Sequence, residues 1–187
     1  VSLQHEQRLR QNYNMKLEQT PSLDSFEVLI VGLVRNCEPS LESEVEALRA
    51  SFESFKKVSF FLVESDSTDG SLEALRELTT RIPNFKFLSL GNLRQSIPDR
   101  IERIARCRNA YLDYVRTTSE KFDYVVVADL DGVNNLLTKE KVATCWKYDE
   151  WSACTANQTG PYYDIYALRA PGWSEMDCWN EARSLYA

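Results

Sequence analysis

The sequence has 187 residues, 43% hydrophobic and 27% charged, which is the composition of a globular chain with one domain or slightly more. Its formal net charge of -6 and its pI near 5.0 argue against nucleic acid as the main partner, because no basic stripe is present to displace counterions. Five widely spaced cysteines without a C-x-x-C pair predict buried free thiols rather than a disulfide framework or a zinc site.

The first 25 residues are polar and charged, and they predict a helical lead-in whose helix ends before Pro21. The single histidine, His5, lies in this segment and is interpreted as a solvated surface residue. No signal peptide and no apolar run long enough to cross a bilayer is present. Residues 26–187 are expected to form a single domain.

Apolar runs and amphipathic segments alternate from Phe26 to Ala128. Strands are predicted at 26–34, 58–63, 85–90 and 124–128. Between them, leucines, valines and phenylalanines recur at helical spacing after residue 38 and after residue 71, and Pro83 ends the second of these helices. Strands that alternate with helices predict crossover connections and therefore a mostly parallel α/β sheet.

Polar residues follow the ends of the predicted strands. Arg35 follows the first strand, Glu64 and Asp66 follow the second, and Asp129 follows the last. In parallel α/β sheets, ligands bind beyond the carboxyl ends of the strands. These four side chains are therefore candidates for a ligand-binding site.

Arginines are concentrated in the segment that opens the third predicted helix. They are Arg94, Arg100, Arg103, Arg106 and Arg108. In an acidic protein this concentration suits a phosphate-bearing ligand, and Arg106 and Arg108 are the two candidates that we set apart. The alternative is a solvated helix face that pairs with Asp99 or Glu102. One stripe of the helix carries Ile101, Ile104, Ala105, Arg108 and Leu112, and an adjoining one carries Arg103, Arg106 and Ala110.

The valine-rich run Tyr124–Ala128 predicts a strand buried on both faces in the middle of the sheet. Because side chains alternate along an extended chain, Asp129 and Asp131 should project the same way, and Gly132 permits a sharp turn. Two neighbouring carboxylates repel each other unless a cation or a donor-rich ligand lies between them, and Mg²⁺ or Mn²⁺ suits that position. The alternative is a surface turn, where aspartate and glycine are common.

The last part of the chain gives weaker patterns. A short helix is predicted at 138–146 and strands at 151–156 and 162–169, whereas residues 171–187 suggest no fold. The strand at 162–169 is rich in tyrosine and contains Asp164 and Arg169. These two residues form either a structural ion pair or part of a wall that binds sugar rings.

Taken together, these motifs resemble the nucleotide-sugar-binding half of a GT-A-fold glycosyltransferase. The resemblance covers about Phe26 to Arg169 and rests on Val34-Arg35-Asn36, the loop from Glu64 to Ser71, Arg106-Cys107-Arg108-Asn109 and Asp129-Leu130-Asp131, in that order. The layout is most similar to the cryptococcal-type α-1,3-mannosyltransferases of glycosyltransferase family 69 and related bacterial or viral proteins. They share an E-S-x-S-x-D-G-[ST] loop and a late Y-D-x-[WY]-x-x-R strand, here Tyr163–Arg169. The resemblance implies a Rossmann-like, mostly parallel sheet flanked by helices.

The resemblance also implies a role for each candidate. Asp131 would bind Mn²⁺ or Mg²⁺ directly, with Asp129 beside it in the metal site, on the ribose or on a metal-bound water. Glu64 or Asp66 would hold the base or ribose. The candidates near the base and diphosphate are Arg35, Arg106 and Arg108, and those facing the sugar or acceptor are Asp164 and Arg169.

Two features depart from the family pattern. Many family members complete the metal shell with a late histidine, and this sequence has none after His5, so Glu175, Asp177, or phosphate and water would serve. The chain is also short for this fold, which leaves open that part of the acceptor-binding half is missing.

The expected activity is transfer of a hexose from a UDP- or GDP-linked sugar to a hydroxyl of a glycan or glycoconjugate. An inverting enzyme would use Asp164 as the base, whereas a retaining enzyme needs none. The alternatives are a metal-dependent phosphohydrolase or nucleotidyltransferase and a non-catalytic nucleotide-sugar-binding module. We expect a cytoplasmic location, or the Golgi lumen if a eukaryotic membrane anchor lies outside this sequence. The oligomeric state is open.

Overall fold

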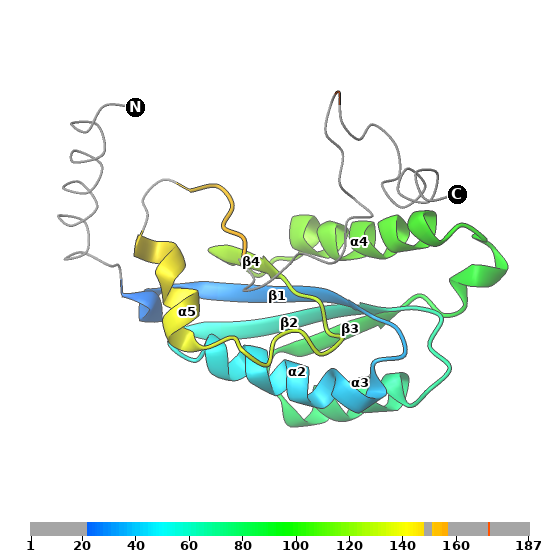
Figure 1. The fold of residues 1–187 in the computed structure, drawn as a ribbon, viewed down its shortest axis with the longest axis horizontal. Helices are drawn as coiled ribbons and strands as arrows, with labels where there is room; N and C mark the ends of the chain where they lie inside the picture. The colour runs from blue at the N-terminus through cyan, green and yellow to red at the C-terminus, as the bar shows by residue number, and fades with distance from the viewer. Residues whose placement is uncertain (1–21, 148–150, 157–171, 173–187) are drawn as a thin grey trace. The chain divides into compact units, whose positions relative to one another are not determined.

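The computed structural model describes residues 22–147, 151–156 and 172. The chain divides into two compact units, residues 1–150 and 151–187, and each is treated by itself. All the described helices and strands lie in the first unit (Figure 1). No helix among the described residues is long and apolar enough to span a membrane.

Four parallel strands form the sheet. They are β1 (Glu27–Val34), β2 (Lys57–Glu64), β3 (Phe85–Ser89) and β4 (Tyr124–Val127), and their order across the sheet is β3-β2-β1-β4. Val34 pairs with Glu64, and Glu64 pairs with Ser89, so β1, β2 and β3 end at almost the same level. The expected α/β class with a mostly parallel sheet flanked by helices is confirmed.

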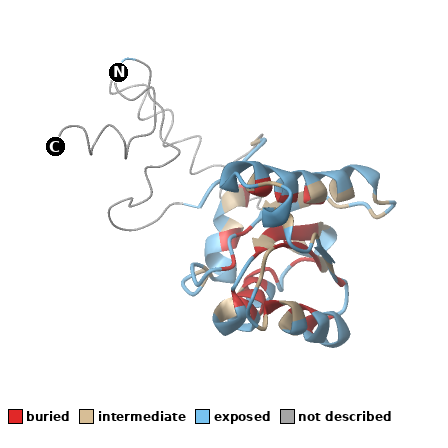
Figure 2. Ribbon diagram, turned by 90° about the vertical axis from the view of Figure 1, so that its right-hand side faces the viewer, coloured by how far each residue is buried: buried red, intermediate tan, exposed pale blue. Residues whose placement is uncertain are grey.

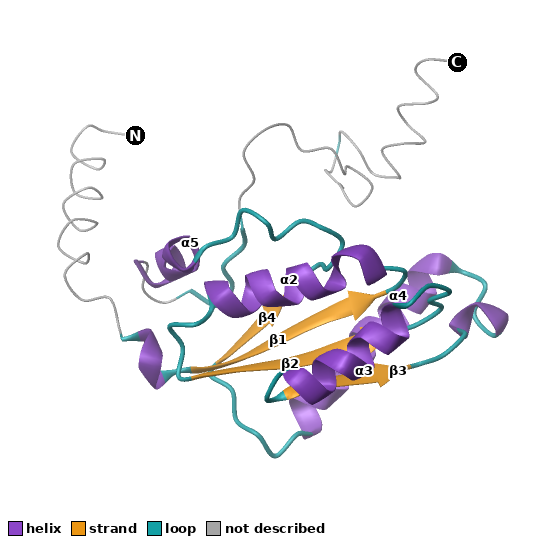
Figure 3. Ribbon diagram, turned by 90° about the horizontal axis from the view of Figure 1, so that it is seen from below, coloured by secondary structure: helices purple, strands orange, loops and turns teal. Residues whose placement is uncertain are grey.

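Helices cover both faces of this sheet. The helices α2 (Glu38–Ser51) and α3 (Ser71–Arg81) lie on one face, and α4 (Arg100–Thr117) lies on the other (Figures 1 and 3). A short α5 (Lys139–Ala143) continues into a 3-10 turn, Thr144–Lys147, and two further 3-10 turns span Leu23–Ser25 and Leu93–Gln95. Pro39 occupies the first turn of α2, where a missing N–H costs no helical hydrogen bond.

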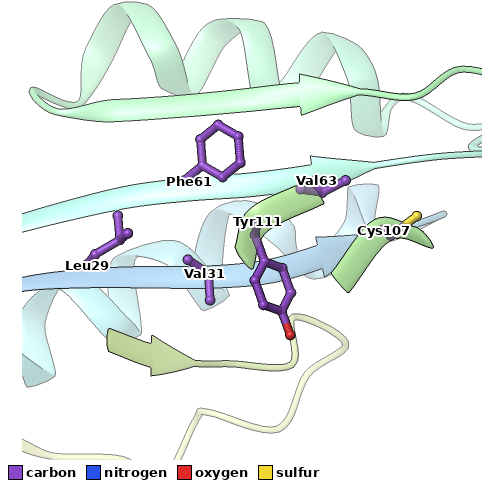
Figure 4. Packing of buried hydrophobic residues seen from close by; sticks show 6 residues of the cluster. All are labelled: Leu29, Val31, Phe61, Val63, Cys107 and Tyr111. Carbon is purple, nitrogen blue, oxygen red and sulfur yellow. The ribbon is translucent and has the colours of Figure 1, made fainter. Parts of the chain in front are cut away.

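The core consists of two apolar layers, one on each face of the sheet. Leu29, Val31, Phe61 and Val63 project toward α4, where they pack against Cys107 and Tyr111 (Figure 4). The alternate residues of β1 and β2 face α2 and α3, and the buried side chains of that layer include Val28, Ile30, Phe60, Leu62, Leu41, Leu48, Leu75 and Leu78. Buried residues accordingly concentrate between the sheet and its helices (Figure 2). This alternation sets which side chains reach the core.

The position of β4 differs from the prediction. Among the described strands β4 lies at the edge of the sheet, and Val125 and Val127 are 43% and 63% exposed. They pair with Leu29 and Val31 and so share the face that α4 covers, but α4 packs over β1 and β2. The prediction of a central strand buried on both faces was wrong for this reason, because a valine run favours strand formation whether or not both faces are covered.

Two other sequence predictions are corrected. Residues 151–156 form no strand, because they have no pairing partner among the described residues. In α4, the residues that face the sheet are Arg103, Cys107 and Tyr111, whereas Ile101 and Leu112, from the apolar stripe that the sequence suggested, are 50% and 38% exposed.

Candidate functional site

The loops after β1, β2 and β4 leave the sheet at its carboxyl edge, because all the strands are parallel. Arg35, Glu64, Asp66 and Asp129 each follow one of these strands, so the structure brings these predicted residues to one edge. The first half of α4 reaches the same edge, since the Cys107 thiol lies 3.3 Å from the Ser65 hydroxyl, just after β2. Figure 4 likewise shows Cys107 near the carboxyl end of β1.

The loop after β2 is tied to the turn after β1 by four hydrogen bonds, which we call the interloop clasp. The backbone N–H groups of Asn36, Cys37 and Glu38 donate to Ser67 Oγ, Ser71 Oγ and Asp69 Oδ2, at 3.2, 2.8 and 3.1 Å. In return, the Thr68 N–H donates to Asn36 Oδ1 at 2.8 Å. Much of the Ser67–Ser71 motif therefore satisfies the first N–H groups of the β1–α2 turn and α2.

Asp69 is a central acceptor in the interloop clasp, because its other oxygen accepts the Ser71 N–H at 3.0 Å. Burial acts to raise the pKa of Asp69, but hydrogen bonds from Ser71 and the Glu38 N–H outweigh it and hold the pKa below its ordinary value. Asn36 and Asp66 adopt φ values of +52° and +57°, which non-glycine residues seldom adopt. The carboxyl ends of β1 and β2 are thus held in a strained, fixed geometry.

Glu64 ends β2, and its side chain is buried. One carboxylate oxygen accepts the Ser67 N–H at 3.0 Å, and the other accepts the Ser89 hydroxyl at 2.5 Å. The residue is 3% exposed. These bonds join the ends of β2 and β3, and the predicted role of Glu64 in holding a base or ribose stays a prediction.

Asp66 forms an ion pair that the sequence did not suggest. Its Oδ2 lies 3.6 Å from Nε of Arg103, and the two side chains are 5% and 8% exposed. Asp66 Oδ1 also accepts the Arg94 N–H at 2.8 Å, while Arg103 Nη1 donates to the carbonyls of Ile97 and Pro98. The spacing of Arg103, Cys107 and Tyr111, four residues apart on one helix face, was the signal that could have found this arginine.

Asp129 and Asp131 are both exposed and flank Leu130, which is 1% exposed. This alternation agrees with two carboxylates that project away from the core. The pKa of the Cys37 thiol is raised by burial, and the negative charges of Asp131, Asp69 and Glu44 raise it further. Asp131 therefore lies near the amino end of α2.

The residues present fit a divalent metal ion held together with phosphate. Within the described ranges, no group of three or more His, Cys, Asp or Glu residues could enclose an ion. Asp129 and Asp131 have no ion pair or side-chain hydrogen bond with described residues, so both are available as ligands. Mg²⁺ usually binds through one or two carboxylates plus water and substrate phosphates, which is what this pair offers.

The described arginines divide into two groups. Those in ion pairs are Arg49, Arg76, Arg81, Arg103 and Arg116. Those without an ion pair among the described residues are Arg35, Arg94, Arg100, Arg106 and Arg108, and all five are exposed. The second group follows β1 or belongs to the loop and the first half of α4, near the carboxyl edge. Unpaired guanidinium groups there are suited to bind an anionic ligand.

Four predicted residues lie outside the described ranges. They are Asp164, Arg169, Glu175 and Asp177. Their expected roles at the acceptor, the sugar or the metal are carried forward only as proposals.

Comparison with known proteins gives limited structural similarities. No family model matches the chain, and no curated protein matches it. The crystal structure of S. aureus TarS 1-349 is similar to this chain with a TM-score of 0.43 and 18% identity, covering 64% of this chain and 31% of that one. A mannosyltransferase from Pyrobaculum calidifontis, PcManGT in complex with GDP-Man and Mn²⁺, has a TM-score of 0.45 and 16% identity, covering 73% and 37%. The chain thus spans about a third of the length of each.

Proposed function

We propose that this chain is the nucleotide-sugar-binding part of a metal-dependent GT-A glycosyltransferase, in a domain that extends from residue 26 to residue 187. The proposed reaction transfers a hexose from a UDP- or GDP-linked sugar to a hydroxyl of a glycan or glycoconjugate. The observation that carries the proposal is the pairing, at one edge of a parallel sheet, of two exposed carboxylates with unpaired arginines. In a chain of net charge -6, that edge offers both a cation site and guanidinium groups for a diphosphate.

In this proposal Asp131 holds Mn²⁺ or Mg²⁺, and Asp129 lies beside it on the metal, the ribose or a metal-bound water. A bound divalent ion supplies Lewis-acid stabilisation of the negative charge on the departing diphosphate. The exposed side chains of Arg35, Arg106 and Arg108 bind the phosphates and base through charge-assisted hydrogen bonds. The rigid interloop clasp holds the Arg35 backbone in place, which limits the reorganisation that ligand binding requires.

The remaining roles belong to residues whose bonds are already made or that lie outside the described ranges. Glu64 and Asp66 would hold the base or ribose with carboxylates oriented by Ser67, Ser89 and Arg103. Asp164 would face the acceptor and act as the base of an inverting reaction, and Arg169 would contact the sugar.

The test measures thermal stability with UDP-glucose, UDP-galactose and GDP-mannose, each with and without Mn²⁺. A ligand that binds only the folded state raises the melting temperature by mass action. We expect one of these donors to stabilise the wild type in a Mn²⁺-dependent manner and Asp131→Asn to abolish that dependence. Asp113→Asn is the matched control, because Asp113 is an exposed acid of α4 paired with Arg116, and it should behave like the wild type.

Turnover assays with the same donors and a panel of phosphate esters then separate the alternatives. A glycosyltransferase releases nucleoside diphosphate from one or a few donors, a phosphohydrolase attacks many esters, and a binding module releases no product. An Asp131→Asn protein that keeps the full Mn²⁺ response would place the metal elsewhere and overturn the proposed site.

A further inference from the structure

Glu44 is a buried acid on α2 that the function proposed above does not use. Its residue is 3% exposed, and an uncompensated carboxylate at such a position is costly. One of its oxygens, Oε2, accepts both the backbone N–H and the side-chain Nδ2 of Asn134, at 3.1 and 2.6 Å. Asn134 follows Asp131 closely in the chain, so this buried charge is satisfied by the loop that carries the two exposed aspartates.

Asn134 extends the contact back to the first aspartate. Its Nδ2 also donates to the backbone carbonyl of Asp129 at 2.6 Å. One turn earlier on α2, the Ser40 hydroxyl donates to the carbonyl of Leu130 at 3.2 Å. We call residues 129–134 the acidic turn, and α2 therefore contacts it at both its beginning and its end.

We infer that Glu44 and Asn134 are positioning residues, which hold the acidic turn so that the Asp129 and Asp131 carboxylates stay in one orientation for a divalent cation. Gly132 adopts a φ of +95° within the turn, so the turn depends on external contacts to fix its path. A buried carboxylate that accepts two hydrogen bonds from one asparagine supplies such a contact.

The inference has two parts that can fail separately. The first is that the Glu44–Asn134 contact orders the acidic turn, which needs no ligand. The second is that this order sets the affinity for the cation, and this part rests on the proposed function. Residues that orient metal ligands typically change metal affinity by about 10- to 100-fold when they are mutated.

The variants are Asn134→Ala, Glu44→Ala and the double variant. Asn134→Ala removes the donor to both Glu44 and Asp129, and its intermediate exposure leaves the core intact. Val45→Ala is the matched control, since Val45 is a fully buried neighbour on α2 whose truncation lowers stability without removing a bond to the acidic turn. Hydrogen exchange of peptides covering 128–137 reports on order, and Mn²⁺ titration calorimetry with saturating UDP or GDP reports on affinity.

We expect Asn134→Ala and Glu44→Ala to speed exchange in 128–137 and to weaken Mn²⁺ binding by about 10- to 100-fold. The double variant should lose no more than the larger single loss, because both changes remove one contact. Val45→Ala should lower the melting temperature while keeping wild-type exchange in 128–137 and wild-type Mn²⁺ affinity.

Unchanged exchange in 128–137 in both single variants, or full additivity in the double variant, overturns the inference. Faster exchange with unchanged Mn²⁺ affinity overturns its second part and leaves the proposed function standing. A wild-type protein that binds no Mn²⁺ with UDP or GDP refutes the proposed function, and the exchange data then still decide whether the contact orders the turn.

Discussion

The Asp66 carboxylate and the Arg103 guanidinium form an ion pair across the carboxyl edge of the sheet, with Oδ2 and Nε 3.6 Å apart and both side chains more than nine-tenths buried. Asp66 belongs to the loop after β2, and Arg103 belongs to α4 on the face opposite α2 and α3. The pair thus connects the strand ends to the helix that carries Arg106 and Arg108.

Arg103→Ala should strongly destabilise the protein. It leaves the Asp66 charge buried without its cation and removes the donor to the Ile97 and Pro98 carbonyls. Breaking one partner of a buried pair costs about 3–5 kcal/mol, so the midpoint of urea unfolding should fall accordingly.

Arg116→Ala is the control for this prediction, because Arg116 pairs with Asp113 on the exposed side of the same helix. An exposed pair contributes less than about 1 kcal/mol, so this variant should unfold close to the wild type. Equal losses in the two variants would mean that burial of the Asp66–Arg103 pair carries no special weight.

The sequence predicted the sheet because its evidence is local. Apolar runs bounded by proline and polar clusters located β1, β2 and β3 within a residue at each end, and the positions of Glu38 and Arg100 at the starts of α2 and α4 were predicted as well. The alternation of Asp129, Leu130 and Asp131 likewise follows from extended geometry alone, and the observed burial agrees with it.

The errors came from contacts between distant parts of the chain. Which face of α4 is buried depends on Asp66, which neutralises Arg103, and no helical periodicity encodes that partner. The exposure of Val125 and Val127 depends on the reach of α4 across the sheet. Glu44 was overlooked for the same reason, since its partner Asn134 is 90 residues away.

Acid should weaken one ion-pair cluster at a defined pH. Glu120 lies between Lys86 and Lys57, at 2.6 and 2.9 Å, and its hydrogen bonds to Lys86 and then Lys57 lower the pKa of Glu120 from 4.5 to about 2. The folded-state pKa is below the unfolded value, so the stabilisation is present above pH 4.5 and is lost as the pH falls from about 4.5 toward 2.

The comparison of wild type with Glu120→Gln tests this dependence. The two melting temperatures should differ most at neutral pH and converge as the pH falls through the window from 4.5 to 2. The difference should be modest, because each surface pair contributes about 0.2–1 kcal/mol. Glu73→Gln, which removes the exposed partner of Arg76, controls for the loss of a surface charge. A Glu120→Gln difference that is independent of pH would contradict the assignment.

Gly32 in β1 should not tolerate a side chain. A Cβ at this position would lie 2.6 Å from the carbonyl oxygen of Ala128, the residue that immediately precedes Asp129. Because the obstacle is backbone, the end of β4 would have to move, and overpacking of this kind costs about 1–3 kcal/mol. Gly32→Ala should therefore lower the unfolding midpoint and also weaken Mn²⁺ binding with UDP or GDP.

Gly70→Ala provides the comparison for Gly32. Its Cβ would lie 3.0 Å from Cγ of Glu38, an exposed and flexible side chain that can move aside. We expect a smaller loss of stability there and no change in Mn²⁺ affinity. If Gly32→Ala binds Mn²⁺ like the wild type, then the end of β4 can shift without displacing Asp129, and the close approach of β1 to Ala128 has only a structural role.

The unpaired arginines of α4 should bind the diphosphate of the ligand. Arg106 and Arg108 are exposed and form no ion pair with described residues, whereas a merely solvated helix face would gain little from a ligand. Replacing both by alanine should weaken UDP or GDP binding, and a charge-assisted hydrogen bond contributes about 1.5–3 kcal/mol. The affinity of the wild type should also fall more steeply with salt than that of the double variant, because its binding includes two more charges. Calorimetric titration at two salt concentrations, with Arg116→Ala as the control from the same helix, decides between the two interpretations. Equal affinities and equal salt dependence in all three proteins would assign Arg106 and Arg108 to the solvated face.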